Sequence, residues 1–129
     1  EYHGKPSERF LVEAMIAAPR GEYIIGIKQQ PALGLALMIG RGGVDVETLN
    51  RHATVLLPLV ERDLDKALQS IGLAAGAPGY EAMLGAARAV AAYAIGNRAR
   101  LRSLDVNPLI VSASGAAIAV DALIEMTQE

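Results

Sequence analysis

The stretch SLDVNPLIVSASGAAIAVDALI (103–124) constrains the fold most, because its turn fixes how two apolar segments must pair. Ala113-Ser114-Gly115 suits a three-residue hairpin loop, in which two right-handed residues are followed by glycine in the left-handed region. Ser112 then faces Ala116, and every other opposed pair follows from that register. The sequence therefore predicts an antiparallel hairpin here.

Three polar side chains interrupt this hairpin at positions that the register brings together. Asn107 faces Asp121, and Asp105 faces Leu123. Because side chains alternate across a strand, we expect Asp105, Asn107 and Asp121 to share one face. The other face is expected to be core, and it carries Leu104, Val106, Pro108, Ile110, Ile118, Val120, Ala122 and Ile124.

The three polar side chains have two interpretations. Opposed Cβ atoms lie roughly 4.5–5.5 Å apart, and oxygen ligands at that spacing suit a hard divalent cation that keeps waters or phosphate oxygens. A solvated sheet face that keeps the hairpin soluble accounts for the same residues. Pro108 has no N–H for the ladder, so we expect the local pairing to be interrupted or at an edge. Spacing alone leaves both interpretations open.

The N-terminal part of the chain predicts strands. Residues 10–16 (FLVEAMI) and 22–28 (EYIIGIK) are rich in strand formers, and AAPRG between them predicts a hairpin with a five-residue connection. Residues 29–34 (QQPALG) have turn composition. Residues 35–40 (LALMIG) predict a third strand that is buried on both faces.

After the glycine-rich break GRGG (40–43), VDVETL (44–49) and HATVLLPL (52–59) are assigned to short strands. From Glu61 onward, apolar residues recur at the spacing of a helix. One apolar stripe ends at Gly72, and it consists of Leu64, Ala67, Leu68 and Ile71.

A second helix is predicted over 80–97, after a loop at 73–79. Its apolar side consists of Met83, Ala87, Val90 and Ala94. The many alanines in this helix suggest close packing on a sheet. Strands, then two helices, then a hairpin predict an α+β fold with a mainly antiparallel sheet and two helices packed on it.

Composition narrows the function classes. The 129 residues, 52% of them hydrophobic, suit one domain with a real core. Acidic and basic residues nearly balance at 14 and 12, and aromatics are few, so we expect no nucleic-acid partner. The chain has no cysteine, which excludes disulfides and thiolate chemistry and fits a reducing compartment.

The apolar runs and the first residue of the chain indicate its cell compartment and its relation to a longer protein. The longest uncharged apolar run, between Arg88 and Arg98, is too short to span a bilayer, and no signal-peptide pattern is present. We therefore expect a cytoplasmic protein without a membrane partner. Because the chain starts without Met, we also expect residues 1–129 to be one domain-sized piece of a larger protein.

Seven motifs occur in an order and spacing that resemble a known family. They are LVEAM (11–15), the Glu22 and Gly26 of GEYIIG, QPALG (30–34), GRGGVDVE (40–47), LPL (57–59), LDVNPLIV (104–111) and AVDA (119–122). Together they resemble the ATP-grasp domain of NDP-forming acyl-CoA synthetases, relatives of the succinyl-CoA synthetase β subunit. The resemblance implies the C-terminal lobe of that domain.

The resemblance also implies a nucleotide and metal site. It matches Asn107 and Asp121 to ligands of the Mg²⁺ that accompanies ATP (or GTP), and Asp105 to an acidic position nearby. The adenine-binding hinge corresponds to Glu13, Ala14 and Met15, and the ribose-binding acid to Glu22. From the residues alone, LVEAMI is an ordinary core strand and Glu22 a solvated carboxylate.

The implied parent is an acid–CoA ligase that converts acid, CoA and NTP to acyl-CoA, NDP and phosphate. In the family the reaction proceeds through an acyl phosphate and a phosphohistidine in another domain. CoA and the carboxylic acid would bind through other domains, and a homo-oligomer is possible. The isolated chain is expected to be inactive, because the lobe that supplies the phosphate-binding lysine is missing.

Several positions depart from the family pattern and suggest an alternative. They are Gln30, Leu33, Arg51, Val55, Ser103 and Leu123. Losing charged residues near a triphosphate favours a degenerate ATP-grasp lobe that serves as a binding or assembly module without catalysis. An unrelated α+β structural domain is a third interpretation, which requires the ordered motifs to be coincidence.

Overall fold

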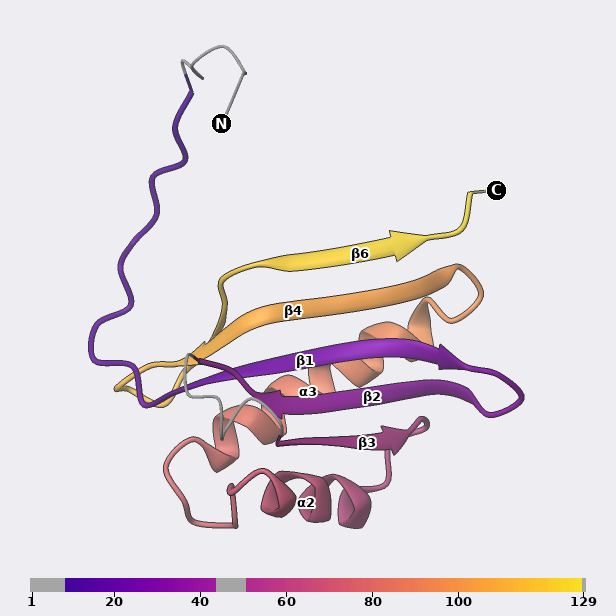
Figure 1. Cartoon of the computed structure of the whole chain (residues 1–129), viewed down its shortest axis with the longest axis horizontal. Coiled ribbons are helices and arrows are strands. Elements are labelled where there is room, and N and C mark those ends of the chain that lie inside the picture. The colour runs from indigo at the N-terminus through magenta and orange to yellow at the C-terminus, as the bar shows by residue number, and fades with distance from the viewer. Residues whose placement is uncertain (1–8, 44–50, 129) are drawn as a thin grey trace.

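The computed structural model describes residues 9–43 and 51–128, and within them it contains one antiparallel sheet and two helices (Figure 1). The predicted α+β class is confirmed. The strands are β1 (Gly21–Gln30), β2 (Gly34–Arg41), β3 (His52–Leu56), β4 (Leu101–Val111), β5 (Ala117–Ala119) and β6 (Ala122–Met126). The helices are α2 (Glu61–Ser70) and α3 (Tyr80–Gly96).

The sheet has the order β3-β2-β1-β4-β5, and β6 also pairs with β4. All five pairings are antiparallel. The long strand β4 pairs with β1 along one edge, and with β5 and then β6 along the other. Figure 1 shows α3 passing behind the strands and α2 beside β3, and the buried side chains of both helices pack against the same face of the sheet. The described part of the chain leaves the opposite face uncovered.

Both predicted helical stripes are confirmed. In α2 the stripe Leu64, Ala67, Leu68 and Ile71 is buried, and the helix ends before Gly72, whose φ of +87° favours glycine. In α3, Met83, Ala87 and Ala94 are fully buried, while Val90 is half-buried and packs against the core. Within the described ranges, neither helix is long and apolar enough to cross a membrane.

Alternation along the central strands defines the core. Tyr23, Ile25 and Ile27 of β1 are buried, and so are Leu35, Leu37 and Ile39 of β2. These odd-numbered residues join the side chains of both helices in one apolar cluster. The even-numbered residues of β1 therefore lie on the uncovered face.

The predicted hairpin between residues 10–16 and 22–28 is wrong. Residues 9–20 form no strand, because β2 and β4 occupy the two edges of β1. The trace of these residues leaves the sheet (Figure 1). Four of its large apolar side chains are 84–93% exposed, and they are Phe10, Leu11, Val12 and Met15, while Ile16 is half-buried.

Instead, β1 forms a hairpin with β2 through the predicted turn. Gln30 pairs with Gly34, and the Leu33 amide donates to the Gln30 carbonyl at 3.1 Å. Residues 35–40 form a strand, as predicted, with only Met38 short of full burial. Of the segment 52–59, the first five residues form β3, and the prediction for 44–49 lies outside the described residues.

The register predicted for the C-terminal hairpin is confirmed. The Ser112 amide donates to the Ala116 carbonyl at 2.9 Å, and Ile110 pairs with Ile118. The same register continues into β6, where Leu104 pairs with Ile124. The turn chemistry was therefore sufficient to align residues far from the turn.

The predicted core face of this hairpin is only partly correct. Leu104 and Val106 are buried, but beyond them Leu109 and Val111 are buried and Ile110 is only half-buried. Between residues 118 and 124, the apolar residues that were expected in the core are exposed, Ile118 by 38%, Val120 by 41% and Ile124 by 43%, and Ala122 is also exposed.

A β-bulge explains the change of face. Tyr23 pairs with Leu109 and Ile25 with Val106, so β4 uses one residue more than β1 between these pairs. An extra residue reverses the alternation beyond it. The bulge occurs at Asn107-Pro108, where the sequence predicted interrupted pairing. The bulge does not account for Ile124, which pairs with Leu104 on the part of β4 before the bulge. Ile124 is exposed because β6 is the outermost strand.

Candidate functional site

The bulge sets the positions of the two predicted metal ligands. The Asn107 amide donates to the Asp121 carbonyl at 3.0 Å, and the Val120 amide donates to the Pro108 carbonyl at the same distance. Asn107 therefore lies opposite Asp121, as the register predicted, and both residues are exposed. Convergence of their side chains on a metal stays a prediction.

Asp105 lies on the uncovered face beside a hollow at Gly26. The two residues are paired across β4 and β1, and a Cβ atom added to Gly26 would lie 3.8 Å from Asp105 Oδ1. It would also lie 3.6 Å from Met38 Cε. The hollow has a volume of about 250 Å³, and it is lined by Gly26, Ile27, Lys28, Met38, Ser103, Leu104 and Asp105. Lys28 and Met38 are not among the residues predicted for the site, although alternation along their strands places both on this face.

Glu22 lies beside the glycine-rich break at the start of β1. The Gly42 amide donates to the Glu22 carbonyl at 2.9 Å. A Cβ atom on Gly42 would lie 3.4 Å from Glu22 Cγ, and one on Gly43 would lie 3.6 Å from Glu22 Oε2. The two glycines thus leave room for the carboxylate, and Glu22 and this part of the break belong to one end of the sheet.

The structure does not bring the predicted hinge residues against the sheet. Glu13, Ala14 and Met15 lie in the extended segment before β1, and all three are exposed, Met15 by 93%. This segment joins the sheet where the Arg20 amide donates to the Val111 carbonyl at 2.8 Å. It therefore leaves the sheet at the end where Glu22 lies (Figure 1).

The predicted metal ligands form an incomplete set. Among the described residues, no group of three or more His, Cys, Asp or Glu side chains is placed to hold a metal. The predicted set offers two carboxylates and one amide, which are the hard oxygen donors that Mg²⁺ prefers. Because Mg²⁺ takes six ligands, phosphate oxygens or waters would have to complete its coordination.

Three of the six positions that depart from the family pattern lie in different surroundings. Val55 is buried in the core, and the Ser103 hydroxyl donates to Glu125 Oε2 at 3.1 Å. Leu123, opposite Asp105, is 63% exposed. None of the three carries a charge.

Hydrogen bonds between the two helices shift the pKa values of Glu61 and Tyr80. Hydrogen bonds from Arg88 at 2.8 and 2.7 Å lower the pKa of Glu61. The hydroxyl of Tyr80 donates to Asp65 at 2.9 Å, and this bond to a carboxylate raises the pKa of Tyr80. Both pairs hold helical residues together on the covered side of the sheet.

Known proteins share both the sequence pattern and the fold. The family model for the ATP-grasp domain matches residues 1–126. The β subunit of the ADP-forming acetate–CoA ligase II of Pyrococcus furiosus is 32% identical over 120 residues, which is 86% of this chain and 51% of the subunit. The ADP-forming acetate–CoA ligase II of Archaeoglobus fulgidus is 30% identical over 103 residues, which is 76% of this chain and 15% of that protein.

A solved structure also shares the fold of this chain. Acetyl-coenzyme A synthetase 1 of Candidatus Korarchaeum cryptofilum, in complex with coenzyme A and Mg-AMPPCP, superposes with a TM-score of 0.70 at 28% identity, covering 86% of this chain and 55% of that one. The chain thus spans about half the length of the P. furiosus subunit. On the strength of the family match and these relatives, the chain belongs to the ATP-grasp family and is homologous to ADP-forming acetate–CoA ligases.

Proposed function

We propose that this chain is the C-terminal lobe of an ATP-grasp domain that binds ATP (or GTP) and Mg²⁺ on the uncovered face of its sheet. The protein that carries it would be an NDP-forming acyl-CoA synthetase. The observation that carries the proposal is the pairing of Asn107 with Asp121 across the bulged hairpin, next to Asp105.

The chemistry of these three residues supports a metal role. Asn107 and Asp121 would hold Mg²⁺ from opposite strands, and Asp105 would add a second carboxylate. When bound, the ion would neutralise phosphate charge, which is a major contribution to phosphoryl transfer. The chain's own part is to fix two ligand-bearing strands in register.

Spacing along the sheet supports a nucleotide lying from Glu22 toward Asn107. Glu22 pairs with Ile110, three residues from Asn107 along β4, which is roughly 10 Å at about 3.3 Å per residue. Because Glu22 lies against Gly42 and Gly43, its carboxylate would repel a phosphate there. We therefore assign the ribose hydroxyls to Glu22 and the triphosphate to the metal ligands.

The remaining parts of the reaction would come from outside this lobe. Glu13, Ala14 and Met15 would meet adenine once the other lobe packs against their exposed segment. CoA and the carboxylic acid would bind to other domains, and a phosphohistidine there would carry the phosphoryl group. That the related Korarchaeum enzyme was solved with coenzyme A and Mg-AMPPCP supports this division.

A degenerate lobe that acts as a binding or assembly module is the second candidate. The burial of Val55, one of the positions that depart from the family pattern, favours it, because a buried valine cannot contact a nucleotide. The two candidates differ in one observable property. The complete protein turns over with Mg²⁺ and nucleotide in the first case, and does not in the second.

The test is the Asp121→Ala variant of a protein that combines this lobe with the rest of its ATP-grasp domain. Mg²⁺-dependent CoA ligation should be abolished while circular dichroism and the unfolding midpoint stay unchanged, because Asp121 is exposed. Asn107→Ala should act similarly but less severely, since a neutral ligand holds a hard cation less strongly. The matched control is Asp63→Ala on α2, and undiminished turnover by Asp121→Ala would contradict the metal role.

A further inference from the structure

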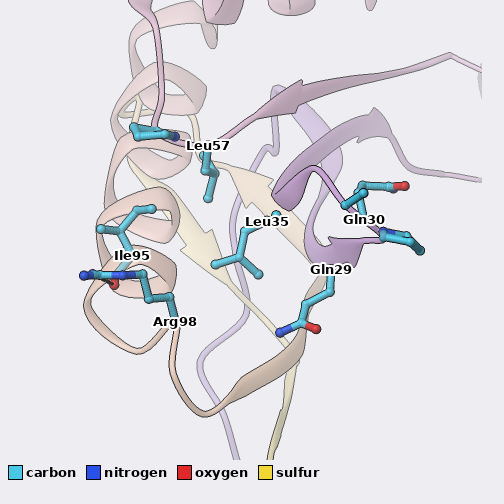
Figure 2. Close-up of a pocket in the computed structure, with 10 residues that line it drawn as sticks. Gln29, Gln30, Leu35, Leu57, Ile95 and Arg98 are labelled. Carbon is cyan, nitrogen blue, oxygen red and sulfur yellow. Dashed lines mark hydrogen bonds between the residues drawn. The ribbon is translucent and has the colours of Figure 1, made fainter.

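A large cavity lies at the end of the sheet that the proposed nucleotide site does not use. Its volume is about 950 Å³. It opens where β1 turns into β2, eight residues along β1 from Glu22, or roughly 26 Å at about 3.3 Å per residue. The described residues that line it are Gln29, Gln30, Pro31, Ala32, Gly34, Leu35, Leu57, Pro58, Ile95 and Arg98 (Figure 2).

Apolar side chains from three elements form the floor of the cavity. Leu35 of β2 and Leu57 after β3 are buried, and Ile95 of α3 is half-buried. The Leu57 amide donates to the Leu35 carbonyl at 2.9 Å, which ties two of these elements together. A cavity with an apolar floor and a volume near the upper end of about 300–1,000 Å³ suits a small organic molecule.

One charged side chain lines the cavity beside this apolar floor. Arg98 is the single ionisable side chain among the described lining residues. Its Nη1 donates to the Ile95 carbonyl at 2.9 Å, and this bond holds the guanidinium at the wall formed by the end of α3. Arginine has five N–H donors, so donors remain for a ligand.

A glutamine on the opposite wall adds polarity without charge. Gln29 Nε2 donates to the Leu101 carbonyl at 3.3 Å, which leaves its Oε1 atom as an acceptor. Figure 2 shows Gln29 and Arg98 on either side of Leu35. A ligand that lies on the apolar floor can therefore meet a cation at one side and an amide at the other.

We propose that this cavity binds an amphipathic carboxylate, with its apolar chain over Leu35, Leu57 and Ile95 and its carboxylate on Arg98. One guanidinium matches one planar carboxylate in charge and geometry. A phosphate dianion would keep an uncompensated charge beside apolar walls, and a cationic head group would be repelled. This site is separate from the nucleotide site and does not depend on the proposed function.

Calorimetry on the chain tests the proposal with decanoate below its micelle concentration. Decanoate should bind saturably with one site per chain, and decyltrimethylammonium should not. Arg98→Gln should weaken decanoate binding about tenfold or more, because it removes a charge-assisted interaction. Arg98→Lys should be intermediate, and Arg102→Gln, on an exposed β4 residue outside the lining, should bind like the original chain.

Backbone amide NMR shifts locate the bound decanoate. Shifts should concentrate at Leu35, Leu57 and Ile95 and spare Gly26 and Asp105. The proposal is overturned by unsaturable binding, by equal affinity for the two head groups, or by shifts centred on Gly26. It is also overturned if the longer protein that carries this chain has lost decanoate binding, since another segment then covers the cavity.

Discussion

The two faces of the sheet differ in what their residues do. On the covered face, Tyr23, Ile25 and Ile27 of β1 are at most 2% exposed and pack under the helices. On the uncovered face, the same strand carries Glu22 beside Gly42 and Gly43, and Gly26 beside Asp105. One strand therefore contributes alternate residues to folding and to the proposed chemistry.

This division has an energetic consequence. Substitutions on the covered face should act on the free energy of unfolding, because they change packing. Substitutions on the uncovered face should act on ligand binding, because their side chains are exposed or lie beside a hollow.

The largest effect is expected on the covered face. Leu68 is fully buried between α2 and the sheet, so Leu68→Ala should lower the free energy of unfolding by about 2–5 kcal/mol. Leu123→Ala removes the same atoms from a residue that is 63% exposed and should be nearly neutral. Urea titration of both variants measures the difference, and equal losses would show that the two faces do not differ in packing.

The next effect is expected in nucleotide affinity. In a protein with both lobes, Glu22→Ala should weaken nucleotide binding by roughly 1.5–3 kcal/mol, as expected for a hydrogen bond to a charged group. That is about tenfold or more in Kd. Calorimetry measures Kd. The Kd of Glu22→Gln, which keeps an acceptor but not the charge, should lie between those of the original protein and Glu22→Ala. An unchanged Kd would make Glu22 a surface carboxylate.

A smaller effect is expected at the hollow on the uncovered face. The added methyl of Gly26→Ala would meet Leu104 O at 3.5 Å and Met38 Cε at 3.6 Å, which are ordinary contacts. The free energy of unfolding should therefore stay within about 0.5 kcal/mol, as for most substitutions that cause no clash. Nucleotide affinity should fall several-fold if the hollow receives the ligand. Weaker folding with unchanged affinity would mean that Gly26 serves the sheet.

Local patterns in the sequence predicted the elements whose period or turn was unambiguous. Four apolar residues at helical spacing located α2, and the loop Ala113-Ser114-Gly115 aligned Asn107 with Asp121 six to eight residues away. Both rest on interactions between residues that are near in sequence. The sheet order depends on distant pairing, which these patterns do not encode.

The errors have two physical causes. Residues 10–16 have strand composition, but no edge of β1 is free to pair with them. At the hairpin, strict alternation placed Ile118 in the core, and the bulge at Pro108 moved it to the other side. Proline marked where the ladder would be interrupted, but it did not indicate how many residues the interruption would add.

The smallest effect is expected at the ion pair between α2 and α3. Arg88 donates two hydrogen bonds to Glu61, yet the two side chains are 50% and 62% exposed, so solvent and salt screen their attraction. Glu61→Gln should therefore lower stability only slightly at neutral pH. Raising the salt concentration should reduce even that difference.

The contribution of this pair to stability should change with pH in a direction that can be measured. Arg88 holds the pKa of folded Glu61 below its usual 4.5, so the pair stabilises the fold above that pH. Its contribution should decrease as the pH falls through the lowered value, where the folded carboxylate also takes up a proton. The free energies of unfolding of the original chain and of Glu61→Gln, measured by urea titration, should therefore become equal at acidic pH. A difference that widened toward low pH, or one that persisted when both variants also carried Arg88→Gln, would show that Glu61 acts through something other than this pair.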